Sequence, residues 1–299
     1  MVTYTNVSAR ALRVSLHISQ WNAARFDRTV SDELTKDKHA AADHARVNKH
    51  LFGTKRASRL TAPEFAAVKD AAEALYLFHI VQTLPWSGMG RNGQRLLPTS
   101  NYMTYTDGIR TRGNALRSAA SDFIDVYPRL KAEAMLRLGD LAKDGDFLDD
   151  DVIAERFSYD VAFSPVPSTG DIRVDLPADQ IDALEADVTS RVESATRLAM
   201  DDAWKRLHDA VARIRKAAST DGVVRSNLID SVREVCDVLA RLNIADDERL
   251  NAMRRKVEIE LTSITVEDLR GNDAVRADTE DRAAKIMASM SAFYSPVAA

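Results

Sequence analysis

Residues 177–218 read PADQIDALEADVTSRVESATRLAMDDAWKRLHDAVARIRKAA. Apolar residues return every three or four positions along this stretch for about nine turns, which is the spacing of one face of an α-helix. The apolar positions are Ile181, Leu184, Val188, Val192, Ala195, Ala199, Ala203, Leu207, Val211 and Ile214. The pattern predicts one long amphipathic helix.

A second amphipathic stretch follows an interruption at residues 219–222. Its apolar positions are Leu228, Val232, Val235, Leu239 and Leu242, and then, after residues 243–246, Leu250, Met253, Val257 and Leu261. Two such stretches joined by a short turn predict a long antiparallel helical hairpin over 177–262, with the pairing of a coiled coil. Residues 263–299 are expected to form C-terminal helices with a frayed tail.

The preceding part, residues 1–176, is expected to be a helical domain with a small sheet. Residues 12–18 (LRVSLHI) alternate apolar and polar side chains, as a half-buried strand does. Residues 157–163 and 172–176 alternate in the same way, and the turn-forming PVPSTGD between them predicts a β-hairpin. Because a lone hairpin is marginal in water, we expect it to pair with residues 14–18 in a three-stranded antiparallel sheet.

Helical spacing accounts for most of the rest of this domain. Residues 21–51 have a polar helical pattern with a break near 38–43, and a helix through 65–79 should end before Pro85. A second long helix is expected over 99–141, kinked or split by Pro128. The predicted fold class is therefore mainly α, with a small antiparallel β-sheet made of a hairpin and an N-terminal strand, plus the long helical hairpin.

Composition excludes several classes of protein. The chain has 299 residues, 45% of them hydrophobic and 29% charged, with no apolar run approaching the length of about 20 residues that spans a bilayer. The N-terminus lacks the apolar stretch of a secretory signal, and Cys236 is the single cysteine, which excludes an internal disulfide. A cytoplasmic protein without a membrane segment is expected.

Residues 88–93 read GMGRNG and match the G-x-G-x-x-G pattern of dinucleotide-binding turns. That turn works where a strand leads into it and a helix opens at its end, so that phosphates lie on the helix N-terminus. Here the preceding residues have helical spacing, and residues 94–97 run into Pro98. We therefore interpret the stretch as a loop between helices and expect no nucleotide cofactor.

No residue set fixes a reaction. The spacing of His39, His44 and His50 scatters these side chains around a helix, so no metal site is expected. The acidic run at 144–151 lacks the glycine and the ligand alternation of a calcium loop, and no G-x-S-x-G sequence occurs. The sequence predicts no catalytic residue and no cofactor, and it favours a protein that is not an enzyme while leaving the question open.

Charge is unevenly distributed along the chain. Residues 1–130 hold 18 Lys+Arg and 11 Asp+Glu, whereas the remaining residues hold 23 and 34. The asymmetry is consistent with a nucleic-acid partner for the first half, or with attraction between the halves, within one chain or head-to-tail between chains. The candidate nucleic-acid-binding residues are Lys55, Arg56, Arg59, Trp86, Arg91, Asn92, Arg95, Arg110 and Arg112.

Several phrases together resemble a known family. They are VSLHISQWNAARFD, TLPWSGMGRNGQRLLPTSNYMTY, RLGDL and RFSYDVAFSPVPSTGDIRVDL. They resemble an uncharacterised family encoded by phages, plasmids and integrative elements, over roughly residues 10–215. The resemblance implies a protein of a mobile element in the cytoplasm of a host cell, in an accessory role beside a ring-forming ATPase, and it implies no catalytic residues.

Two functions follow as hypotheses. The first is a non-enzymatic assembly or adaptor protein of a mobile element, which forms a homo-oligomer or binds a protein partner through its helical hairpin. The alternative is a single-strand nucleic-acid-binding protein of phage recombination or replication. The alternative requires the candidate arginines and lysines to converge on one surface without acidic partners.

Overall fold

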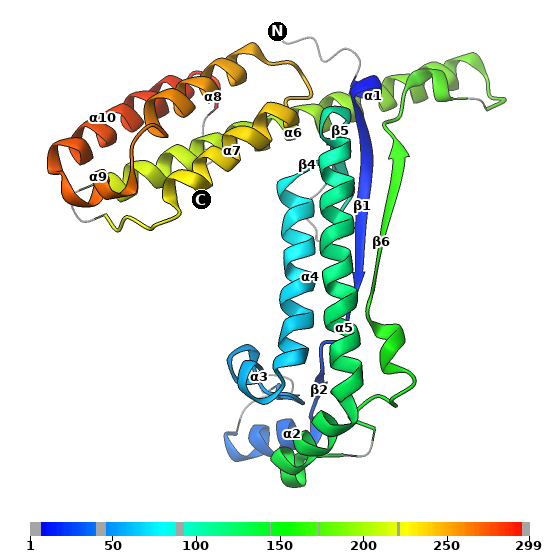
Figure 1. The fold of residues 1–299 in the computed structure, drawn as a ribbon. Helices are drawn as coiled ribbons and strands as arrows, with labels where there is room; N and C mark the ends of the chain where they lie inside the picture. Colours follow the sequence, from blue (N-terminus) through cyan, green and yellow to red (C-terminus); the bar gives the residue numbers. More distant parts are fainter. Residues whose placement is uncertain are drawn as a thin grey trace. The chain divides into compact units, whose positions relative to one another are not determined.

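The computed structural model describes residues 7–39, 46–87, 93–143, 145–172, 174–219 and 222–294. Helices make up most of this part of the chain, and the strands form a small antiparallel sheet and a separate two-stranded pair. The predicted fold class, mainly α with a small antiparallel sheet and a long helical hairpin, is confirmed (Figure 1).

The chain divides into two compact units. Unit 1 comprises residues 1–15, 80–105 and 161–299, and unit 2 comprises residues 16–79 and 106–160. This division differs from the predicted boundaries at residues 176 and 262. The reason is that segments far apart in the sequence share one core, so the N-terminal strand, the helical hairpin and the C-terminal helices all contribute to unit 1.

The four-stranded sheet has the strand order β4-β5-β1-β6. Its strands are β1 (Ala11–Ser19), β4 (Leu84–Pro85), β5 (Arg95–Pro98) and β6 (Ser158–Pro165). β1 pairs antiparallel with β5, with Val14 opposite Arg95, and β4 pairs antiparallel with β5, with Leu84 opposite Leu96. The chain from residue 86 to residue 94 thus connects the two strands of a hairpin, and a strand follows the glycines where a dinucleotide-binding turn would open a helix.

The hairpin predicted over 157–176 is wrong in its second half. β6 forms beside β1 as expected (Figure 1), but residues 174–177 have no strand structure. Val174 is 51% exposed and Leu176 is 40% exposed, so the second alternating segment finds no strand partner within the described chain. The hairpin of this sheet is β4–β5 instead.

A helical bundle completes unit 1, and its longest member is α6 (Ala178–Ala218). α7 (Leu228–Leu242) returns along α6, and α8 (Glu248–Leu261) folds back along α7 (Figure 1). The second helical stretch of the predicted hairpin is therefore two helices. After the short α9 (Val266–Gly271), α10 (Asp273–Met290) packs along α6. The shorter elements of this unit are α1 (Val7–Arg10), η1 (Thr99–Asn101) and η4 (Thr169–Asp171).

Unit 2 is built on parts of two long helices, α4 (Pro63–Val81) and α5 (Tyr102–Leu138). A Cβ on Gly108 of α5 would lie 2.0 Å from the Phe78 ring of α4, so glycine is required for this close approach. Farther along, the rings of Phe65 and Phe123 have centroids 5.2 Å apart. The rings of this core are Trp21, Phe52, Phe65, Phe123, Tyr127, Phe147 and Phe157.

Residues 21–51, predicted to be helical, differ from that prediction. Their described part contains α2 (Arg28–Asp37), flanked by β2 (Ala24–Phe26) and β3 (Asn48–His50), which pair antiparallel. The strand pair places Lys49 next to the start of α2. The remaining short elements of unit 2 are α3 (Lys55–Thr61), η2 (Gly139–Leu141) and η3 (Ile153–Arg156).

Lys49 is the centre of a buried ion cluster in unit 2. Its ammonium nitrogen lies 2.6 Å from the carboxylate of Asp146 and 3.5 Å from that of Asp27, and it donates to the Leu141 carbonyl at 2.8 Å. Each of the three charged side chains is at most 10% exposed. The cluster joins β3, the start of α2 and the chain after α5, and no pattern in the sequence predicts it.

Asp27 is also the N-cap of α2. Its carboxylate accepts a hydrogen bond from the Val30 N–H at 3.2 Å. That bond lowers the pKa of Asp27, and the nearby ammonium groups of Lys143 and Lys49 lower it further against the opposing effect of burial. The ionised carboxylate is therefore the stable form at neutral pH.

Candidate functional site

The predicted nucleic-acid-binding residues do not form one group. Lys55, Arg56, Arg59, Arg110 and Arg112 belong to unit 2, whereas Trp86 and Arg95 belong to unit 1. Arg91 and Asn92 lie outside the residues that the structure describes. The set is thus divided between the two compact units of the chain.

Most of the described arginines in the set already have partners. The guanidinium of Arg59 lies 2.8 Å from the carboxylate of Asp70, and that of Arg110 lies 2.8 Å from Asp107. Arg112 stacks 3.9 Å above the Phe78 ring and donates to the Gly108 carbonyl. The charges of Arg59 and Arg110 are therefore paired with carboxylates, and the guanidinium of Arg112 is held against a ring of its own unit.

Arg95 and Trp86 have structural roles. Arg95 donates to the hydroxyl and the carbonyl of Thr83 and to the carbonyl of Ile80, which satisfies acceptors at the C-terminal end of α4. Arg206 of α6 donates to the same two carbonyls, at 3.0 Å for Ile80 and 2.8 Å for Thr83. Trp86 packs against the core of the bundle, with the Arg13 guanidinium 5.8 Å from its ring centroid.

The charge asymmetry of the sequence does not carry over to the folded units. The chain segments of unit 2 contain 18 Lys+Arg and 20 Asp+Glu, and those of unit 1 contain 23 and 25. The two units therefore have the same small negative net charge. The acidic residues of 106–160 fold together with the basic residues of 16–79, so the basic first half is not a separate surface.

One face of α3 remains basic. Of the described candidate cations, Lys55 and Arg56 have charged side-chain groups without a hydrogen-bond or ion-pair partner among the residues that the structure describes. Leu60 is 86% exposed, and helical spacing places it on the same face as Arg56, four residues earlier. Lys69 of α4 is close enough that the charge of Lys55, after the larger effect of burial, lowers its pKa. We call Lys55, Arg56 and Leu60 the α3 face.

The first turns of α6 form a second unpartnered surface. None of the seventeen residues from Ala178 to Ser194 is buried, whereas the helix packs into the bundle from Ala195 onward. Ile181, Leu184, Val188 and Val192 form an apolar stripe along these turns; Leu184 is 39% exposed, and Val192, at the base, packs against the bundle core. We call residues 178–194 the α6 arm.

The α6 arm is strongly acidic. It contains five carboxylates and one cation, Arg191, which pairs with Asp187 at 2.8 Å. The other four carboxylates, Asp179, Asp182, Glu185 and Glu193, have no ion-pair partner among the described residues. At 100° per residue, Glu185 and Asp182 flank one edge of the apolar stripe. The arm thus presents an apolar stripe with a negatively charged border.

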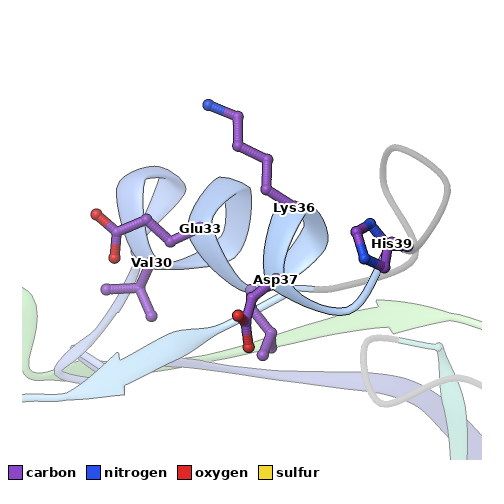
Figure 2. A pocket seen from close by; sticks show the side chains of 6 residues that line it. Val30, Glu33, Lys36, Asp37 and His39 are labelled. Carbon is purple, nitrogen blue, oxygen red and sulfur yellow. The ribbon is translucent and has the colours of Figure 1, made fainter.

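A hollow on α2 does not have the character of a binding site. It is lined by Val30, Glu33, Leu34, Lys36, Asp37 and His39. Figure 2 shows that its charged side chains point away from one another, Glu33 and His39 toward opposite ends of the helix and Lys36 away from Asp37. No group of side chains converges there on a common point, as orientation of a bound small molecule would require.

The described residues also offer no arrangement for metal or thiol chemistry. Among them, no three His, Cys, Asp or Glu side chains are grouped so as to hold a metal ion. Burial raises the pKa of the Cys236 thiol to about 11, which keeps it protonated and unreactive at neutral pH. His79 is 1% exposed within the packed face of α4.

No family model, curated protein or solved structure matches the chain. None of the helices in the described ranges is both long and apolar enough to cross a membrane. A proposal about function therefore depends on the two surfaces, the α3 face and the α6 arm. Sequence periodicity found the apolar stripe of the arm but assigned it to the interior of the helical hairpin.

We expect only weak, weakly salt-dependent binding to single-stranded nucleic acid. With Lys55 and Arg56 as the unpaired cations of the described set, log K against log salt should have a slope no steeper than about −1.4, at about −0.7 per phosphate contacted. Fluorescence anisotropy of a labelled oligonucleotide at low and near-physiological salt measures this slope. A steeper slope that an Arg91→Ala variant reduces would instead support the nucleic-acid hypothesis.

Proposed function

We propose that this protein is a non-enzymatic assembly or adaptor protein that acts by helical self-association, with the α6 arm as its contact surface. The observation that carries this proposal is that seventeen helical residues bury no side chain although four of them form an apolar stripe. In proteins, most of the stability of a helix comes from packing of its apolar face. Among the residues that the structure describes, Val192 at the base of the arm packs against the bundle core, whereas Ile181, Leu184 and Val188 do not.

The arm is connected to a well-anchored body. From Ala195 onward, α6 packs against α7, α8 and α10, and Ala199, Ala203, Leu207 and Val211 are fully buried. The helix is continuous through this transition, so the bundle holds the arm in a helical conformation before any partner binds. Preorganisation of this kind lowers the entropic cost of association.

The resemblance to proteins of phages, plasmids and integrative elements supports the same role. A protein of such an element that self-assembles can serve as an accessory to a larger machine, and the resemblance implies a ring-forming ATPase as the protein partner. No group of residues in the described structure argues for catalysis over binding.

The test is sedimentation velocity over a concentration series. The variant Ile181→Ala/Leu184→Ala/Val188→Ala removes the stripe while retaining good helix formers. We expect the unsubstituted protein to self-associate and the variant to do so at least tenfold more weakly. Ile259→Ala on α8 is the matched control, because Ile259 is also a branched apolar residue and is 72% exposed.

Two results would contradict the proposal. One is a protein that stays monomeric throughout the concentration series. The other is association that the stripe variant and the Ile259→Ala control leave equally unchanged, which would place the contact elsewhere on the chain. Circular dichroism of each variant confirms that its helices are retained.

A further inference from the structure

The two unpartnered surfaces of the chain are complementary in charge and alike in having an exposed apolar centre. The α6 arm has a net charge of −4 and an apolar stripe, and the α3 face has two unpaired cations and Leu60. We infer that the α6 arm of one copy docks on the α3 face of a second copy, so that the protein assembles head to tail. This inference rests on the proposed function and names the surface that receives the arm.

Charge decides between this arrangement and a symmetric one. A pair of α6 arms packed against each other would bring two stripes together, but it would also bring two surfaces of net charge −4 into contact. Like charges placed across an interface cost free energy, whereas opposite charges favour association and fix its orientation. The arm therefore fits a basic surface better than it fits another arm.

The α3 face has the residue types that the arm needs. Lys55, Arg59, Arg56 and Leu60 follow one another around one side of α3 by helical spacing, while Ser58 is buried on the other side. Arg59 is neutralised by Asp70, which leaves Lys55 and Arg56 free to approach Asp182 and Glu185 at the edge of the stripe. Leu60 would then contact the stripe itself, and its exposed fraction of 86% would fall.

A head-to-tail contact leaves one arm and one α3 face unused at the ends of each oligomer. Such heterologous contacts form rings when the rotation between copies closes and open chains when it does not. Oligomers should therefore grow with concentration beyond the dimer. The charged residues of the α6 arm and of the α3 face lie at the surface. Assembly should therefore weaken as the salt concentration rises.

Charge reversal of each surface tests the inference in the full-length chain. The first variant is Asp182→Lys/Glu185→Lys on the arm, and the second is Lys55→Glu/Arg56→Glu on α3. We expect each variant alone to associate at least tenfold more weakly than the unsubstituted protein in sedimentation velocity. Lys36→Glu/Lys38→Glu on and beside α2 is the matched control, since both of these lysines are exposed cations of unit 2.

Mixing the two variants is the decisive measurement. In the mixture, the reversed arm meets a reversed α3 face, and the unsubstituted arm meets an unsubstituted α3 face, so association should return. The inference is wrong if the Lys55→Glu/Arg56→Glu variant associates as the unsubstituted protein does, because arm-to-arm contact does not involve α3. It is also wrong if the mixture stays monomeric, because the mixture contains both complementary pairs of surfaces.

The outcomes also separate this inference from the proposed function. If the unsubstituted protein is monomeric, both fail. If association depends on Ile181, Leu184 and Val188 but not on Lys55 and Arg56, the proposed function stands and the head-to-tail arrangement is excluded.

Discussion

Replacing Lys49 with Met should lower the free energy of unfolding of unit 2 by about 3–5 kcal/mol, the usual cost of removing one partner from a buried ion cluster. The ammonium of Lys49 lies between the carboxylates of Asp27 and Asp146, and these are 2% and 10% exposed. Methionine has a similar length, so it leaves little cavity. The loss comes from the buried carboxylate of Asp146, which loses its ion-pair partner, and from that of Asp27, which keeps only Lys143 at 3.5 Å. Urea unfolding followed by circular dichroism and by tryptophan fluorescence measures it.

A double-mutant cycle separates this charge effect from packing. Removing the Asp146 charge as well, in Lys49→Met/Asp146→Asn, should restore part of the lost stability, because the asparagine oxygen can still accept from the Lys143 N–H that Asp146 now accepts from. Arg110→Met is the control in the same unit, where the exposed pair with Asp107 should contribute less than about 1 kcal/mol. If Lys49→Met lowers the free energy of unfolding by less than about 1 kcal/mol, water reaches the ion cluster.

The contribution of this ion cluster to stability should also depend on pH. The pKa of Asp27 is lower in the folded protein than its ordinary value of 3.8, so its ionisation contributes stability above that pH, and this contribution is lost as the pH falls through the folded value. In Lys49→Met one of the groups that lower this pKa is gone. The variant should therefore lose less stability than the unsubstituted protein when the pH falls below about 4.

Periodicity predicted the helices well because their apolar seams depend on neighbours in the sequence. It was less successful for strands, since residues 172–176 have as regular an alternation as 12–18 yet only the latter pair within the described chain. Besides β6, β1 pairs with β5, whose residues 95–98 are separated from it by about eighty positions. A four-residue strand with two leucines has too little pattern of its own to be distinguished from a loop.

Pro128 shows how packing overrides a local preference. The sequence predicts a kink or a split there, and the helix is not split, since α5 runs through Pro128. The proline is exposed, whereas Phe123, Tyr127 and Leu130 are fully or almost fully buried on the opposite face. The free energy of burying these three side chains exceeds the cost of the one hydrogen bond that proline removes.

The candidate site was only partly predictable for a similar reason. The residue types within the long seam differ along its length: Ile181, Leu184, Val188 and Val192 precede a run containing Ala195, Ala199 and Ala203. The part from Ala195 onward packs against other helices, and the alanines there let the helix axes approach closely. The sequence pattern also does not reveal an arginine that donates hydrogen bonds to the carbonyls of distant residues, as Arg95 does to Ile80 and Thr83.

Arg276 also donates hydrogen bonds to the carbonyls of distant residues. Its replacement should cause the second large loss of stability. Its guanidinium, on α10, donates to the carbonyls of Ala217, Ser219 and Gly222, where α6 ends. A helix end leaves several carbonyls without partners and carries a partial negative charge, so one cation there satisfies acceptors and interacts favourably with the dipole. Gly222 permits the arrangement, because a Cβ at this position would lie 2.2 Å from the Lys216 carbonyl oxygen.

Arg276→Met should therefore destabilise unit 1 by about 2–4 kcal/mol, since hydrogen bonds from a charged donor contribute about 1.5–3 kcal/mol and the carbonyls are left without that donor. Arg276→Lys should recover only part of this loss, because an ammonium cannot reproduce the planar fork of a guanidinium. Arg282→Met on the same helix is the control, since Arg282 pairs with Asp278 at an exposed site. Urea unfolding that shifts equally for Arg276→Met and Arg282→Met would show that the end of α6 does not depend on this cation. If Arg276→Met alone is destabilising, α10 is what holds the C-terminal end of α6.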